Sequence, residues 1–319
     1  MTKKIISVVL VLMMALAFVS CDGNILKKNK EKKEYKTVNS VILPMSPVRT
    51  LNPAATIDED TYFISKLVYD SLFILDEHMV PKGSLAKNYS FNAGEKSLTI
   101  DLIETTWQDG EALTGEDVAF TINAYKKAGE ACQYNSTVSK IDYVNASGNQ
   151  VTIFFYEKNN MAIDMLTFPI IPEHGFKSTA EAIKGDGAFI PMGSGQYKCD
   201  SYNATDKLVL APNENYHGEK AINTLTFEVM PGKENAYKLL ETSGISLMIS
   251  KAMDRETEIR NKSIKIENFP MNEVEFLGFN FYRESLKKPE VRKAIASAVN
   301  SESIIEECYY NSGIVNDNL

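Results

Sequence analysis

Apolar and polar positions recur with two periods along the chain, and together they predict a mixed α/β protein. Alternation with period two, typical of half-buried strands, is found at residues 98–102, 151–155, 207–211, 224–229, 245–249 and 274–281. Apolar residues three or four positions apart, typical of amphipathic helices, are found at 61–72, 116–128, 234–242 and 290–310. Because residues 224–249 follow the order strand, helix, strand, they indicate the unit from which α/β lobes are built.

The segment Trp107–Ile122 is the most specific in the chain, and it predicts a strand end, a turn and a helix start. Asp109-Gly110 supplies the turn, since glycine adopts a positive φ without strain. Thr114 and Asp117, three positions apart, predict a capping box at the start of the helix. Three apolar positions of that helix fall on one face: Val118, Ile122 and Tyr125. We interpret Trp107 as a packed aromatic beside the turn rather than a ligand contact.

This order of an aromatic residue, Asp-Gly, Leu-Thr and Glu-Asp-Val resembles the signature of extracytoplasmic solute-binding proteins of ABC importers, in the peptide and nickel class. Other segments resemble the same family in the same order: Leu51–Pro53 with Leu67–Leu72 (opening strand and first helix), Pro191–Lys198 (a turn), Phe276–Asn280 (a strand that crosses into a second lobe) and Pro289–Asn300 (the next helix). Several positions depart from the family pattern: Asn52 and Asn300 replace aspartates, Ser194 and Gln196 alter the turn, and Gly244–Leu247 lacks an acidic pair.

The resemblance implies an α/β, periplasmic-binding-protein-like fold of two lobes. Residues 36–75 and 186–273 would form the first lobe, residues 76–185 a subdomain inserted into it, and residues 274–319 the start of a second lobe. Family members are usually longer, so we expect a C-terminally truncated chain whose second lobe is largely missing.

The N-terminal residues predict export. Lys3 and Lys4 precede an apolar run, Ile5–Val19, which is too short to span a bilayer comfortably and is typical of a signal peptide over residues 1–20. Cys21 at its end resembles the lipidated cysteine of bacterial lipoproteins, with plain secretion as the alternative. Residues 21–35 are rich in lysine and lack apolar periodicity, which indicates a disordered tether.

Charge and cysteine content narrow the function. The formal net charge of -8 becomes about -13 over residues 39–319, once the basic N-terminus is left out, and an acidic surface argues against nucleic-acid binding. It mildly favours cationic or neutral solutes. Besides Cys21, three cysteines remain, and we expect free thiols, with one disulfide as the open alternative: Cys132, Cys199 and Cys308.

Candidate catalytic chemistry is not found in the sequence. The three histidines are far apart and are interpreted as surface or loop residues: His78, His174 and His217. Ser194 lacks the glycine two residues before it that a nucleophile elbow needs, and the glycines beside it do not continue into a dinucleotide or phosphate loop. We therefore predict no enzyme activity, no catalytic residue, no metal site and no cofactor.

By resemblance, the chain would bind a solute outside the cytoplasm and deliver it to an ABC permease by hinge closure. An oligopeptide is the first solute class, and nickel, haem or an oligosaccharide are the alternatives. Three groups of residues are candidates for ligand contact: Thr56, Ile57, Asp58 and Glu59 in the loop after Leu51–Pro53; Tyr134 and Asn135 in the inserted subdomain; and Phe276, Gly278, Phe279 and Asn280 on the crossing strand. For Thr56 and Glu59, a capping box before helix 61–72 is an equally good interpretation. For Tyr134 and Asn135, packing or plain exposure is the favoured interpretation.

The partners predicted in this way are a small-molecule or peptide ligand, the membrane permease and the lipid anchor, and no nucleic acid is expected. The protein itself is expected to be a monomer in the cell envelope. Two other functions stay open. One is a surface or signalling lipoprotein that keeps the scaffold without transport, and the other is a truncated product without function.

Overall fold

The structure, a computed structural model, describes residues 39–92, 94, 96–232, 234–250, 259–269 and 274–315. The predicted signal peptide (1–20), tether (21–35) and lipidated Cys21 lie outside the described residues. Among the described residues, no helix has the length and apolar content needed to cross a bilayer.

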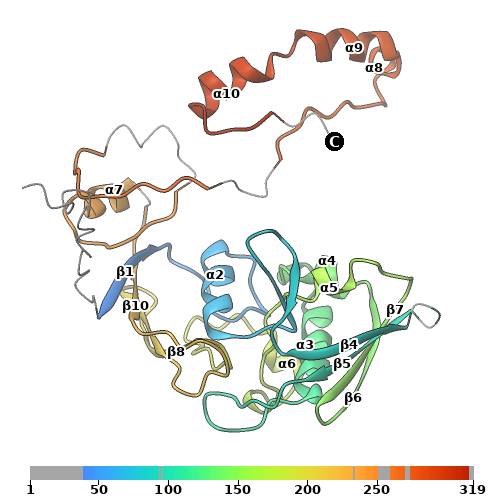
Figure 1. Cartoon of the computed structure of the whole chain (residues 1–319), viewed down its shortest axis with the longest axis vertical. Coiled ribbons are helices and arrows are strands. Elements are labelled where there is room, and N and C mark those ends of the chain that lie inside the picture. Colours follow the sequence, from blue (N-terminus) through green and yellow to red (C-terminus); the bar gives the residue numbers. More distant parts are fainter. Residues whose placement is uncertain are drawn as a thin grey trace, which may run out of the picture. The chain divides into compact units, whose positions relative to one another are not determined.

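The first of two four-stranded sheets combines the start of the described chain with residues near 200–230 (Figure 1). Its strand order is β1 (Ser40–Met45), β10 (Thr224–Val229), β9 (Lys207–Pro212) and β8 (Tyr197–Tyr202). β1 runs parallel to β10, with Ser40 opposite Thr224 and Met45 opposite Val229, whereas the other pairs are antiparallel. The parallel pair therefore brings two carboxyl ends to one edge of the sheet.

The second sheet is antiparallel and lies within the predicted inserted subdomain. Its strand order is β4 (Ala86–Asn92), β5 (Ser97–Leu102), β7 (Gln150–Phe155) and β6 (Ile141–Ser147). A short hairpin of β2 (Phe73–Leu75) and β3 (Pro81–Gly83) precedes it. One buried cluster of apolar side chains includes members from both four-stranded sheets, for example Ile100 and Leu208. The domain boundaries proposed from the sequence thus remain predictions.

The longer helices are α2 (Glu59–Val68), α3 (Gly115–Ala128), α7 (Glu234–Glu241), α9 (Pro289–Ala298) and α10 (Ser301–Tyr309). Short helical turns are α4 (Asn135–Val138), α5 (Ala162–Met165), α6 (Thr179–Ala182), α8 (Glu284–Lys287), η1 (Gly129–Ala131) and η2 (Glu173–Gly175). α3 packs on the second sheet against β6 and β7, and its predicted apolar face is fully buried.

The start of α3 is held by the carboxylate of Asp117, which is only 4% exposed. Its Oδ2 accepts hydrogen bonds from the backbone N–H of Thr114 (2.9 Å) and from Nε1 of Trp107 (3.3 Å). Its Oδ1 accepts a bond from the backbone N–H of Glu173 (2.8 Å). The predicted capping box is confirmed, and Trp107, with no exposed area, is confirmed as a packed residue. Gly110 has the positive φ (94°) expected of the turn.

Helix α2 ends where the glycine turn of residues 193–195 meets it. The N–H of Gly195 donates to the carbonyl of Val68 at 2.8 Å. A Cβ on Gly193 would overlap that same carbonyl oxygen, and a Cβ on Gly195 would lie 2.7 Å from the Val68 carbonyl carbon. Glycine is therefore required by close backbone approach at both positions. Gln196, which departs from the family pattern, is itself bonded through Nε2 to the carbonyl of Glu219 at 2.7 Å.

The opening part of the chain corrects two predictions. The first strand is β1, at residues 40–45, whereas Leu51–Pro53 is a turn in which the Asn52 side chain accepts a hydrogen bond from the N–H of Ala54. The capping box of Thr56 with Glu59 is wrong, because α2 begins at Glu59 with Asp58 as its N-cap. The Thr56 hydroxyl instead accepts from the N–H of Asp58 and donates to its carboxylate.

Three further predicted elements differ from the structure. Residues 245–249 form no strand, because the N–H groups of Ser246 and Leu247 both point to one carbonyl, that of Ile42, and so make no ladder. Residues 274–281 form no strand either, and none of the described strands pairs with them. The pattern at 290–310 is two helices, since Asn300 caps α10 by accepting the N–H of Ser303.

Replacing Asp117 tests whether this carboxylate organises the subdomain. In Asp117→Ala, three donors lose their acceptor, and the Trp107 indole among them is buried, so we expect a loss of about 2–4 kcal/mol in the free energy of unfolding. The measurement is urea denaturation followed by circular dichroism. The exposed Asp142, replaced in the same way, is the control and should change stability by no more than about 0.5 kcal/mol. Equal stability of the two variants would contradict this role.

Candidate binding site

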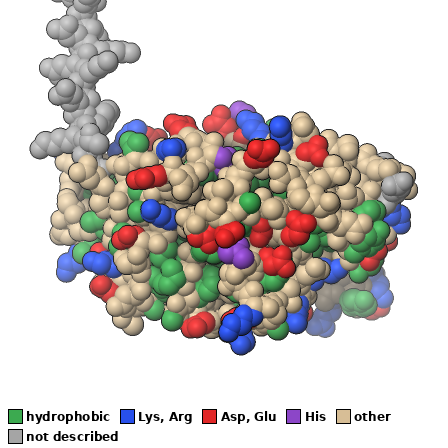
Figure 2. Space-filling view, turned by 90° about the horizontal axis from the view of Figure 1, so that it is seen from below, with side chains coloured by type: hydrophobic (Ala, Val, Ile, Leu, Met, Phe, Trp, Pro, Cys, Tyr) green, Lys and Arg blue, Asp and Glu red, His purple; other side chains and the backbone are tan. Residues whose placement is uncertain are grey.

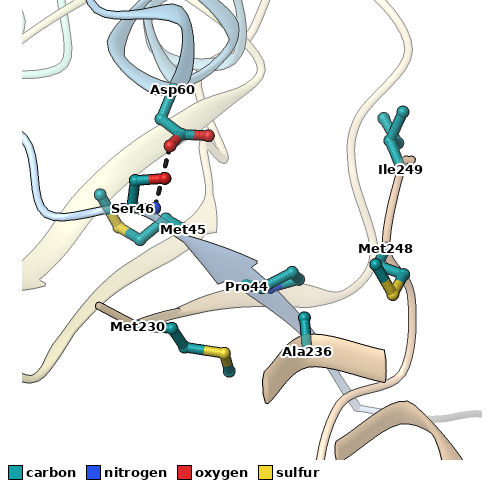
Figure 3. A pocket seen from close by; sticks show the side chains of 8 residues that line it. All are labelled: Pro44, Met45, Ser46, Asp60, Met230, Ala236, Met248 and Ile249. Atoms are coloured by element: carbon teal, nitrogen blue, oxygen red, sulfur yellow. Dashed lines mark hydrogen bonds between the residues drawn. The ribbon is translucent and has the colours of Figure 1, made fainter. Parts of the chain in front are cut away.

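A hollow of about 60 Å³ lies at the edge where β1 and the neighbouring β10 end (Figure 3). It is lined by Pro44, Met45, Ser46, Asp60, Met230, Ala236, Met248 and Ile249. In α/β sheets, ligands bind outside the carboxyl ends of the parallel strands. This hollow occupies that position in the described part of the first sheet.

Backbone hydrogen bonds fix the wall of the hollow. The N–H of Met230 donates to the carbonyl of Met45 at 2.8 Å, which continues the β1–β10 pairing beyond the strands. The N–H of Ser46 donates to Oδ2 of Asp60 at 2.9 Å, as the dashed line in Figure 3 marks. Since Asp60 lies in the first turn of α2, this bond ties the helix start to the end of β1.

The lining is mostly apolar and contains three methionines, Met45, Met230 and Met248. Thioether side chains are unbranched and polarizable, and they adapt to ligands of different shape. The carboxylate of Asp60 is the acidic group of the lining, and it lies at the N-terminus of α2, where the helix dipole favours its negative charge. The arrangement suits a ligand with apolar parts and one amine.

The first group of predicted contact residues adjoins this hollow along the chain. Thr56 is buried, whereas the side chain of Ile57 is 69% exposed. The loop is joined to the inserted subdomain, because the N–H of Gln133 donates to the carbonyl of Thr56 at 3.4 Å. Asp58 and Glu59 lead directly into Asp60. The loop is therefore next to the hollow along the chain, although none of its four residues is among those that line it.

Tyr134, from the second predicted group, packs inside the protein. It is 9% exposed, and its ring is stacked on that of Tyr125 at 5.2 Å between centroids. Burial raises the pKa of its hydroxyl well above the usual value. Asn135 begins α4 and is half-buried. The structure thus brings the first two predicted groups together, but turns the aromatic ring of the second toward the core.

The third predicted group, on residues 276–280, is exposed. Phe276 and Leu277 are 75% and 59% exposed, so neither face of this segment is core within the described chain. Asn280 accepts a hydrogen bond from the N–H of Tyr282 at 3.0 Å and starts a turn before α8. The ligand role of this group remains a prediction.

All three histidines lie near carboxylates, and Nε2 of His78 is 3.7 Å from Oε1 of the neighbouring Glu77. Nε2 of His217 lies 3.2 Å from Oδ2 of Asp70, whose side chain is 6% exposed, and His217 itself is an exposed loop residue, as predicted. The Asp70 carboxylate also raises the pKa of Tyr216, together with burial, to about 12. Nε2 of His174 lies 2.9 Å from Oδ2 of Asp109. Partial burial raises the pKa of Asp109, but hydrogen bonds from His174 and from the N–H of Glu111 outweigh it, so the pKa is lowered.

Acidic side chains gather around a histidine near the middle of one face in Figure 2. Such a face repels polyanions. Within the described ranges, no group of three or more His, Cys, Asp or Glu side chains could hold a metal ion.

Sequence reasoning missed the methionines and Asp60. Met230 follows a strand that the pattern did predict, at 224–229, so its position at a strand end could have been noticed. The position of Met45 could not have been noticed, because the sequence pattern puts the first strand at residues 51–53, after the true β1. Met248 reaches the hollow through the contact of Ser246 and Leu247 with Ile42, which local sequence does not encode.

One family model and several individual proteins match this chain. The sequence model described as "Bacterial extracellular solute-binding proteins, family 5 Middle" matches residues 80–319. The oligopeptide-binding protein AppA of Bacillus subtilis is 24% identical over 326 residues, which cover 98% of this chain and 60% of that protein. The glutathione-binding protein GsiB of Escherichia coli is 22% identical over 278 residues, covering 84% of this chain and 53% of that protein.

Solved structures share the fold. The substrate-binding protein CtaP of Listeria monocytogenes superposes with a TM-score of 0.74 and 26% identity, covering 85% of this chain and 57% of the other. NikZ of Campylobacter jejuni, solved with Ni(L-His), gives a TM-score of 0.68 at 22% identity, covering 88% and 57%. The chain therefore spans between about half and 60% of these relatives' lengths.

The three cysteines among the described residues, all free thiols, should differ in reactivity. Burial raises the pKa of Cys132 and of Cys199 to about 11, so at pH 8 only about one in a thousand is a thiolate. Cys308 is exposed. We expect iodoacetamide at pH 8 to alkylate Cys308 first, and the rates at Cys132 and Cys199 to increase as the pH rises toward 11. Peptide mapping by mass spectrometry measures each site, and fast labelling of native Cys132 would contradict its burial.

Proposed function

The chain belongs to the bacterial extracellular solute-binding proteins of family 5, and from this premise we propose that it binds an oligopeptide and delivers it to an ABC permease. Membership confirms the predicted family and the α/β periplasmic-binding-protein-like fold, and the relatives are named as binding proteins rather than enzymes. The particular solute, the permease and the monomeric state belong to the proposal.

The observation that carries the proposal is the hollow at the carboxyl ends of β1 and β10. Its three methionines offer an adaptable apolar surface, and Asp60 offers a charge for an amine. An oligopeptide has this combination, since its side chains vary while its amino terminus is constant. AppA of Bacillus subtilis, which matches 98% of this chain, is described as oligopeptide-binding.

Delivery would follow from closure of two lobes on the solute. A closed form is favoured only when the ligand makes contacts there that the open form lacks. The hollow and the loop Thr56–Glu59 would supply one side of these contacts. The other side would come from a second lobe, of which residues 274–319 are the predicted start.

The experiment is calorimetric titration of the chain with peptides, carried out in parallel on a fusion that continues residue 319 with the C-terminal part of Bacillus subtilis AppA. Asp60→Asn keeps an oxygen for the N–H of Ser46 but removes the charge. We expect binding of a peptide with a free amino terminus to weaken about fivefold to tenfold, equivalent to about 1–1.4 kcal/mol.

Two controls accompany this titration. An N-acetylated peptide should lose nothing in Asp60→Asn, because it carries no amine. Asp142→Asn, which removes an exposed carboxylate on β6, should leave both affinities unchanged. The proposal fails if no peptide binds to either form of the protein, or if the two variants behave alike.

We propose a lipid anchor on Cys21 as the means of holding the protein at the membrane. The support is the sequence alone: two lysines, an apolar run and a cysteine at its end. Expression in Bacillus subtilis with an alkyne analogue of palmitate should label the wild-type protein and retain it in the membrane fraction. Cys21→Ser should be unlabelled. Equal labelling of the two proteins would show that Cys21 is not the lipidated residue.

A further inference from the structure

The outward face of the second sheet, opposite α3, has a composition that the proposed function does not use. The inward residues of its two central strands are fully buried, among them Leu98 and Ile100 on β5 and Val151 and Ile153 on β7. Side chains alternate across a strand, so the residues between them point to the other face. These outward residues are Thr99, Asp101, Gln150, Thr152 and Phe154 on the central strands, with Asn88, Ser90, Tyr143, Asn145 and Ser147 on the edge strands.

The middle of this face is polar without charge. Thr99 and Thr152 lie opposite each other, and their hydroxyl oxygens are 3.1 Å apart. Ser90 and Asn145 continue the same row on the two edge strands and are exposed. In a chain in which 24% of residues are charged, four neutral hydrogen-bonding side chains side by side form an area suited to an uncharged polar ligand.

One end of the face is an aromatic platform. The rings of Tyr143 and Phe154 are stacked, with centroids 4.2 Å apart and planes at 11°. Tyr143 nevertheless keeps 48% of its surface exposed. An exposed aromatic ring fixed by its neighbour offers a flat apolar area at little cost in conformational entropy.

The other end is a hollow of about 370 Å³ with polar walls. Nε2 of Gln150 donates to Oδ1 of Asp101 at 2.8 Å, which holds both planar groups in place and leaves acceptors on each. The hollow is lined by Lys87, Asn88, Asp101, Leu102, Glu104, Ser147, Asn149 and Gln150. Its charged members are thus one lysine and two carboxylates.

The two ends are about 13 Å apart, since Phe154 is four residue steps along β7 from Gln150. We propose that this face, defined by the row Ser90, Thr99, Thr152 and Asn145 with the ends just described, binds a neutral oligosaccharide. One sugar ring would lie on Tyr143 through its apolar C–H face, and its hydroxyls would exchange hydrogen bonds with the threonine row and the Asp101–Gln150 pair. The site is separate from the hollow at β1 and β10 and does not depend on the proposed peptide function.

The small number of charged side chains on this face favours a neutral oligosaccharide over anionic or cationic ligands. A polyanionic glycan or a nucleic acid needs several cations, and Lys87 is the cation among the face residues named above. A cationic ligand would be drawn to the acidic surface elsewhere rather than to a neutral row. Hydroxyl groups, which both donate and accept, match hydroxyl and amide side chains without leaving a buried charge unpaired.

The test uses the full chain and calorimetric titration with three neutral probes, cellohexaose, maltohexaose and chitohexaose, and one anionic probe, hexagalacturonate. We expect at least one neutral probe to bind. Tyr143→Ala should weaken that binding at least fivefold, and Asn145→Asp, an exposed substitution that adds a charge to the row, should also weaken it. Tyr282→Ala is the matched control, because Tyr282 is 95% exposed and lies outside the sheet.

Each result decides the proposal. Circular dichroism establishes that the variants are folded, and Asn145→Asp keeps the test valid if Tyr143→Ala is destabilised. Binding that weakens in both sheet variants, but not in Tyr282→Ala, supports the proposal. It is overturned if no neutral probe binds, if binding is unaffected by both sheet variants, or if the anionic probe binds more tightly than the neutral ones.

Discussion

The buried carboxylate of Asp117 is the interaction on which the region of α3 and the second sheet depends. It accepts hydrogen bonds from the indole of Trp107, the backbone of Thr114 and the backbone of Glu173, so one residue joins a turn, a helix start and a distant segment. One turn later, the hydroxyl of Thr121 accepts the N–H of Ile171 at 2.9 Å and extends the same junction. Because an acceptor removed from a buried site leaves each donor unpaired, this carboxylate constrains all three segments together.

The sequence predicted the strands, helices and caps that depend on residues close together in the chain. The strands at 207–212 and 224–229, the helix from Gly115 and its capping by Asp117 all follow from local patterns, and the structure confirms them. It did not predict what depends on distant partners. β1 is a strand because β10, almost two hundred residues later, lies beside it. Residues 274–281 alternate as a strand should, but strand structure requires a paired neighbour, and the described residues provide none.

In the candidate site, too, some features follow from local sequence and others depend on distant residues. The loop Thr56–Glu59 was identified by resemblance, and the structure puts it beside Asp60 and a hollow at the ends of β1 and β10. The methionines of that hollow come from three separate segments, so no local motif contains them. Tyr134 shows a limit of local sequence, since an aromatic residue after a helix can be exposed or packed, and stacking on Tyr125 keeps it inside. The specific motif near Trp107 therefore identifies the family, whereas the proposed ligand site lies at the edge of another sheet.

The central claim is that a solute meets the protein at the carboxyl ends of β1 and β10. Photo-crosslinking tests it most directly, with an oligopeptide that carries a benzophenone side chain and with the labelled residues mapped by mass spectrometry. The account predicts labels within residues 44–60 and at Met230, Met248 or Ile249, and their loss when unmodified peptide competes. Competed labels found only on the inserted subdomain, around Trp107 or on the sheet of β4 to β7, would contradict it.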